Sequence, residues 1–138
     1  MTRVARFAAY AALLAAVGAA VSASAAAPNA KARISYTADQ AWRGRLAFYQ
    51  NCAECHGANL GGVTGPALAG PDGNLQWQTG KDIYGEISVA MPVGNGGGLP
   101  ADEYVDIMAF LYQQHHKPAG KKPLDVRAIE ADAAPMGL

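Results

Sequence analysis

The sequence has few of the residues that several large functional classes require. Only 2 cysteines occur among its 138 residues, and its 11 basic residues are balanced by 11 acidic ones. A nucleic-acid-binding domain is expected to show a basic excess gathered in a stripe, and the sequence has neither feature. A structural zinc site needs four ligands, and no second cysteine pair is available to complete one. Nucleic-acid partners and structural zinc are therefore both disfavoured.

The alternation of apolar and polar residues that marks a half-buried strand is also missing, and the sequence contains no internal repeat. Apolar residues recur instead at helical spacing within 37–51, 81–89 and 100–114. Glycine and proline are frequent from 57 to 80 and from 94 to 98, which indicates long loops. We therefore expect an all-α domain over residues 37–116, with three to four short helices.

The two ends of this domain carry further signals. Thr37 and Gln40 have the spacing of a capping box at a helix N-terminus, and Trp42, Leu46 and Tyr49 fall on one face of that helix. After the last helix, proline and glycine return without any helical period. We interpret residues 117–138 as an exposed C-terminal tail.

A long apolar run is found only near the N-terminus. Residues 7–21 carry no charge and follow two arginines, and the run is short for a membrane-spanning helix. Ala23-Ser24-Ala25 fits a cleavage site, so we expect residues 1–25 to be a signal peptide and 26–36 a flexible lead. Cleavage after Ala26 fits nearly as well, and an uncleaved anchor is the alternative. The mature protein is expected in the periplasm, without a stable membrane span.

The two cysteines lie in the motif Cys52-Ala53-Glu54-Cys55-His56, which is the pattern of c-type haem attachment. Two thiols at this spacing bond to the vinyl-derived carbons at one edge of the porphyrin, and the adjacent imidazole becomes an axial ligand. A thioredoxin-like redox pair would require these cysteines at a helix start in an α/β pattern, and a plain disulfide would leave His56 without a role. We expect one covalent haem c, held by Cys52 and Cys55, with His56 on iron.

The residues around the motif carry a resemblance to a known family. Gly44, Phe48 and Cys52 follow the spacing of the first helix of class I cytochromes c, and Ile107-Met108-Ala109-Phe110-Leu111 resembles the last helix. In that family the glycine lets the two helices cross closely and the aromatic residue packs at the crossing, where Phe110 would be the partner here. The resemblance covers residues 39–114 and implies the cytochrome c fold, wrapped round one haem.

The resemblance also implies the remaining haem contacts. Pro66, in Gly65-Pro66-Ala67-Leu68, matches the proline whose carbonyl accepts the Nδ1 proton of the proximal histidine, and Leu68 would line the haem face. Met91, in the pair Met91-Pro92, matches the sixth ligand of iron.

Three further assignments stay open at this point. Trp77 is expected either to donate its indole N–H to a haem propionate or to be plain core. Tyr84 and Tyr104 are unassigned candidates for the same contact. His115 or His116 would replace Met91 in a bis-histidine site, although both are expected to be solvated.

A His/Met pair leaves the iron six-coordinate and suits one-electron transfer rather than substrate chemistry. The resemblance thus implies a periplasmic electron carrier, not an enzyme, that receives electrons from a dehydrogenase and passes them to an oxidase or another cytochrome. The segment 91–100 is similar to that of cytochromes serving quinoprotein alcohol dehydrogenases. A haem peroxidase or diatomic-gas sensor with a labile sixth ligand is the alternative. Lysines 81, 117, 121 and 122 are candidates for steering a redox partner.

Overall fold

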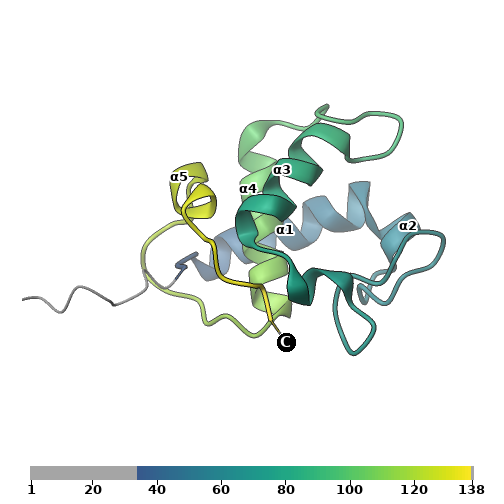
Figure 1. The fold of residues 1–138 in the computed structure, drawn as a ribbon. Helices are drawn as coiled ribbons and strands as arrows, with labels where there is room; N and C mark the ends of the chain where they lie inside the picture. The colour runs from purple at the N-terminus through teal and green to yellow at the C-terminus, as the bar shows by residue number, and fades with distance from the viewer. Residues whose placement is uncertain (1–33, 138) are drawn as a thin grey trace, which may run out of the picture. The chain divides into compact units, whose positions relative to one another are not determined.

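A computed structural model describes residues 34–137 (Figure 1). Its elements are α1 (Ala38–Asn51), α2 (Ala53–His56), the 3-10 helix η1 (Asn74–Trp77), α3 (Gly80–Ala90), α4 (Ala101–Gln114) and α5 (Val126–Glu130). Within this range the chain forms no β-strand beyond an isolated bridge between Thr79 and Pro135, so the all-α prediction is confirmed. The predicted signal peptide and most of the lead lie outside the described residues.

The first helix begins as predicted but buries a different face. Thr37 and Gln40 form the complete capping box, with Gln40 N–H donating to Thr37 Oγ1 at 3.2 Å. The expected apolar residues Trp42, Leu46 and Tyr49 do share a face, yet that face is exposed. The buried face carries small residues and one aromatic ring: Gln40, Ala41, Gly44, Ala47 and Phe48. Small side chains are inside because α1 crosses another helix too closely to accommodate large ones.

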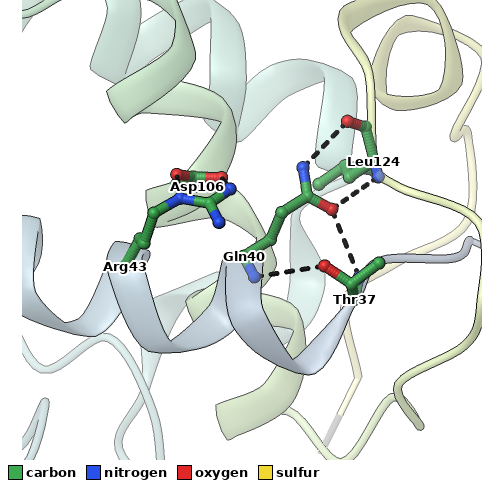
Figure 2. A network of polar contacts seen from close by, with 5 residues as sticks. All are labelled: Thr37, Gln40, Arg43, Asp106 and Leu124. Atoms are coloured by element: carbon green, nitrogen blue, oxygen red, sulfur yellow. Dashed lines mark hydrogen bonds and ion pairs between the residues drawn. The ribbon is translucent and has the colours of Figure 1, made fainter.

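That crossing joins α1 to α4 and is the main helix pair of the domain (Figure 1). A Cβ on Gly44 would overlap the backbone carbonyl of Asp106, so only glycine permits this approach. About one turn further along α1, the rings of Phe48 and Phe110 pack with centroids 5.4 Å apart. This contact confirms Phe110 as the predicted partner of Phe48. Beside the crossing, Arg43 forms a bidentate ion pair with the Asp106 carboxylate, with its Nε and Nη2 donating at 2.6 and 2.9 Å (Figure 2).

The prediction of an exposed C-terminal tail is wrong. Leu124, Ile129 and Met136 are at most 4% exposed and belong to the core. The side chain of Gln40 binds both backbone groups of Leu124: its Nε2 donates to the carbonyl at 3.0 Å, and its Oε1 accepts from the N–H at 2.7 Å (Figure 2). Three isolated apolar residues in a stretch rich in glycine and proline show no period, so no sequence pattern predicts their burial.

The last residues, 131–137, run back along the domain and are called the C-terminal strap below (Figure 1). Asp132 in the strap accepts a hydrogen bond from the hydroxyl of Tyr112 on α4 at 2.6 Å. Burial, together with this bond, raises the pKa of Tyr112 above its ordinary value. Within residues 34–137 no helix is long and apolar enough to cross a membrane.

Candidate haem-binding site

A cavity of about 680 Å³ opens between α1, α2, α3, α4 and the loops that join them. Its volume lies within the roughly 300–1,000 Å³ that is usual for small-molecule and cofactor sites. Six of the seven residues predicted to hold or line the haem border this cavity, and they come from three separate segments of the chain: Cys52, Cys55, His56, Pro66, Leu68 and Met91. The structure therefore brings the sequence-derived site together.

The Cys-x-x-Cys-His motif is shaped by the end of α1 and the single turn of α2. Cys52 caps α1, and its carbonyl accepts the N–H groups of Cys55 at 3.2 Å and His56 at 2.9 Å. This tight turn places both thiols and the imidazole on the cavity wall. The sequence did not predict α2 as a separate helix, because four residues are too few to show a period.

Both cysteines are free thiols, with Cys52 partly buried and Cys55 exposed. Burial, and to a smaller extent the neighbouring Cys55, raises the pKa of the Cys52 thiol to about 11. A redox-active Cys-x-x-Cys pair depends on a thiol whose pKa is lowered, because the thiolate is the nucleophile. The environment of Cys52 has the opposite effect, so the thioredoxin-like alternative is disfavoured.

The imidazole of His56 is oriented by the loop that follows it. Its Nδ1 lies 2.9 Å from the carbonyl oxygen of Pro66, the bond that the family resemblance implied. Since a carbonyl only accepts, Nδ1 must carry the proton, and the Nε2 lone pair is left free for a metal. The loop stays close because Gly65 packs against the ring, where an added Cβ would lie 3.0 Å from Cε1.

On another side of the cavity, Met91 caps the C-terminus of α3. Its carbonyl accepts a hydrogen bond from the hydroxyl of Tyr104 at 2.7 Å. The same hydroxyl accepts from the N–H of Leu99 at 3.3 Å, so one side chain of α4 ties both ends of the glycine-rich segment 91–99. Sequence reasoning left Tyr104 without a role, because the partner atoms are backbone groups that no motif records.

Trp77 is the predicted site residue that the structure does not place at the cavity. Trp77 is 78% exposed and does not border the cavity. It is therefore not a core residue, and its indole N–H is not the buried donor on which the propionate role was argued. Instead its neighbours Asn74 and Gln78 present polar side chains to the cavity. The 3-10 turn of η1 directs these two residues inward and Trp77 outward, a rotation that residue type alone does not predict.

The two histidines proposed as rival ligands are also placed elsewhere. His115 is 2% exposed and does not border the cavity, and its ring nitrogens face the carbonyl oxygens of Leu68 and Gly137. His116 is exposed, as predicted. Bis-histidine ligation finds no support in this arrangement, and the expectation that His115 is solvated is wrong.

The rest of the cavity wall is apolar inside and acidic at its edge. The apolar lining includes Leu68, as the resemblance implied, together with Ile83, Ile87 and Leu111. Three exposed carboxylates also border the opening: Glu54, Asp82 and Glu86. No lysine or arginine in the described range borders it, so the lysines proposed to steer a partner lie away from the mouth.

These residues fit a covalently bound haem. Two thiols three positions apart, an imidazole with a free Nε2, and a thioether border one apolar cavity, a donor set that suits c-type attachment with His/Met ligation. Within residues 34–137 no three or more His, Cys, Asp or Glu side chains cluster in a way that would hold a metal ion.

Comparison with known proteins agrees with this site. Residues 39–111, more than half of the chain, match the family described as cytochrome C oxidase, cbb3-type, subunit III. Among solved structures, the chain is similar to the sulfane dehydrogenase SoxCD from Paracoccus pantotrophus, with 29% identity and a TM-score of 0.52. That match covers 59% of this chain and 46% of the other, so the chain spans less than half of its length. No curated protein matches.

The family match begins at Asp39, within the capping box, and ends at Leu111, so it includes the whole attachment motif and the Met91 segment. It therefore covers the elements that form the cavity, and a cytochrome c domain implies covalent haem c. The chain belongs to the family of the cbb3-type oxidase subunit III and is a class I c-type cytochrome.

Proposed function

We propose that this protein is a periplasmic one-electron carrier that holds a single haem c through Cys52 and Cys55, with His56 and Met91 as axial ligands. The observation that carries the proposal is the convergence of both thiols, the oriented imidazole and the anchored methionine on one cavity. A haem bound there would supply an iron that gains and loses one electron.

His56 and Met91 would hold the haem iron, and the chain's own residues restrain both of them. The Pro66 carbonyl holds the proton of His56 on Nδ1 and so keeps Nε2 available. Tyr104 fixes the backbone of Met91, which restrains the thioether. Ligands restrained in this way would move little when the iron changes oxidation state, and the apolar wall would exclude water. Both effects favour rapid outer-sphere electron exchange and a raised reduction potential.

The peroxidase or gas-sensor alternative is less well supported by the cavity. Activation of peroxide requires an acid–base side chain close to the open coordination position. His56 is the only histidine of the described residues that borders the cavity, and its Nδ1 is already bonded. No arginine or lysine of this range borders it either, and the carboxylates that do, Glu54, Asp82 and Glu86, are exposed at its edge. These features favour electron transfer without substrate chemistry.

The comparisons support the choice of partners. SoxCD is a dehydrogenase by its description, and the matching family is an oxidase subunit. We therefore assign a dehydrogenase as the electron donor and an oxidase or another cytochrome as the acceptor; the quinoprotein alcohol dehydrogenases remain the donor class proposed from segment 91–100. The three carboxylates at the mouth favour a partner face with basic side chains. Export rests on the N-terminal sequence alone.

The test is stopped-flow electron exchange of the mature holoprotein with small redox reagents, beside a peroxidase assay. We expect fast one-electron exchange, negligible peroxide turnover, and a rate with a cationic reagent that falls as salt is added. Rapid peroxide turnover together with slow electron exchange would refute the proposal in favour of the haem enzyme.

A further inference from the structure

The side chain of His115 is a buried polar group that the proposed electron transfer does not use. It follows directly after α4, where it is the C-cap residue, and is 2% exposed. Its Nδ1 lies 2.5 Å from the carbonyl oxygen of Gly137, and its Nε2 lies 3.1 Å from the carbonyl oxygen of Leu68. One ring therefore lies between two backbone segments that are far apart in sequence.

The Leu68 side of this bridge belongs to the loop that orients His56. The N–H of Leu68 donates to the carbonyl of Leu60 at 2.8 Å, and the Leu68 carbonyl faces His115. Two residues earlier, the carbonyl of Pro66 bonds to Nδ1 of His56 at 2.9 Å. Between them, the N–H of Asn74 donates to the carbonyl of Ala67 at 3.0 Å. The short segment 66–68 is thus fixed at four points, and His115 supplies one of them.

The Gly137 side belongs to the C-terminal strap, which is bound to another part of the cavity wall. The N–H groups of Met136 and Gly137 donate to the carbonyls of Gln78 and Gln76, at 2.7 and 2.9 Å. The side chain of Met136 is 0% exposed, which anchors the strap in the core. Gln78 borders the cavity, so the strap holds one wall segment directly.

We propose that His115 is a positioning residue for the proximal side of the haem site: it ties segment 66–68 to the C-terminal strap and so fixes the Pro66 carbonyl that orients His56. The inference rests on the proposed function, in which His56 is an iron ligand. Groups that hold a ligand's hydrogen-bond partner set the ligand's orientation and donor strength. Loss of the bridge lets the Pro66 carbonyl move away and makes the imidazole a weaker donor, which favours the ferrous state.

The experiment compares four variants of the full chain with wild type. Both partners are carbonyl oxygens, which only accept, so the ring donates to both only when both of its nitrogens carry a proton. His115→Phe keeps a planar ring but removes these donors, while His115→Gln retains an amide donor. Met136→Ala loosens the strap and leaves the His115 side chain itself in place, since Met136 does not border the cavity. His116→Asn is the matched control, since His116 is exposed and its φ of 58° is one that asparagine tolerates.

Two readouts are measured: the reduction potential of the holoprotein, and the hydrogen exchange of the backbone amides of Leu68 and Ala69. We expect His115→Phe to shift the potential to more positive values and to speed exchange at both amides about tenfold or more, the loss expected for one hydrogen bond to a buried backbone group. Met136→Ala should act in the same direction, His115→Gln should restore part of both effects, and His116→Asn should match wild type.

The results separate this inference from the proposed function. If no variant carries haem, the proposed function fails, yet amide exchange in the apoprotein still tests the bridge. Unchanged potential and unchanged exchange in His115→Phe would overturn the inference, as would equal shifts in His116→Asn. If His115→Phe does not fold, the test rests on His115→Gln and Met136→Ala. Amide hydrogen exchange at Leu68 that is as slow as in wild type in both variants would overturn the inference.

Discussion

Removal of the Tyr104 hydroxyl should open the segment that carries Met91 while leaving the fold in place. The hydroxyl makes two hydrogen bonds to backbone, to the Met91 carbonyl at 2.7 Å and from the Leu99 N–H at 3.3 Å. In Tyr104→Phe both are lost and the ring remains. Each such bond contributes about 0.5–1.5 kcal/mol net, so the closed state of segment 91–99 loses about 1–3 kcal/mol.

This magnitude translates into a measurable change in ligand competition. At 1.4 kcal/mol per factor of ten, the open form of the segment becomes about 5- to 150-fold more populated. Carbon monoxide binds ferrous iron only when Met91 is displaced, so its apparent affinity should rise by the same factor. The assay is an optical titration of the reduced holoprotein with carbon monoxide, beside the weak red-edge band that methionine ligation gives the ferric form.

The matched control is Tyr84→Phe on α3, which makes the same chemical change. The Tyr84 hydroxyl has no hydrogen bond to any residue in the described range, so its loss should leave carbon monoxide affinity as in wild type. The reasoning is refuted if Tyr104→Phe folds and binds carbon monoxide no more tightly than wild type, or if Tyr84→Phe has an equal effect.

Three further predictions concern stability. Gly44→Ala should destabilise the protein by about 1–3 kcal/mol or more, because its Cβ meets the backbone of α4. Gly85→Ala, with open space around it, should stabilise the protein by about 0.5–1 kcal/mol. Denaturant midpoints that shift in the same direction in both variants would contradict this. Gln40→Leu should cost about 2–6 kcal/mol in the same assay, since two buried backbone groups lose their partners. Burial and the bond to Asp132 raise the pKa of Tyr112 in the folded state, so stability is full below pH 10 and falls above it by about 1.4 kcal/mol per pH unit; Tyr112→Phe should fall less steeply, and parallel curves would refute the assignment.

The attachment site could be predicted because its parts are close in sequence or defined by the motif. Cys52, Cys55 and His56 act through one turn of chain, and Pro66 follows within a short loop, so their spacing largely determines their geometry. The helix bounds of α3 and α4 followed from period and breakers for the same reason. Motif spacing, helical period and helix-breaking residues act over a few neighbouring residues, so they predict local structure whatever packs against it.

The errors arose where long-range packing decided the outcome. The helical spacing of apolar residues predicts Trp42 on the buried face of α1, yet the close crossing at Gly44 places the small residues of α1 on that face. Trp77 is exposed because the turn of η1 directs its neighbours into the cavity. His115 is buried by a strap whose apolar anchors show no period. The burial of His115 and of the small residues of α1 depends on contacts between segments distant in sequence, which composition and spacing do not encode, whereas the exposure of Trp77 follows from the local turn of η1.

The measurement that tests the central claim most directly is a carbon monoxide and redox titration of the mature holoprotein, wild type beside Met91→Ala. The account predicts a low-spin wild type that excludes carbon monoxide, and a Met91→Ala variant that binds it readily at a lower potential. A wild type that binds carbon monoxide as readily as Met91→Ala, with the same potential, would show that Met91 is not a ligand and would contradict the assignment of this protein as a His/Met electron carrier.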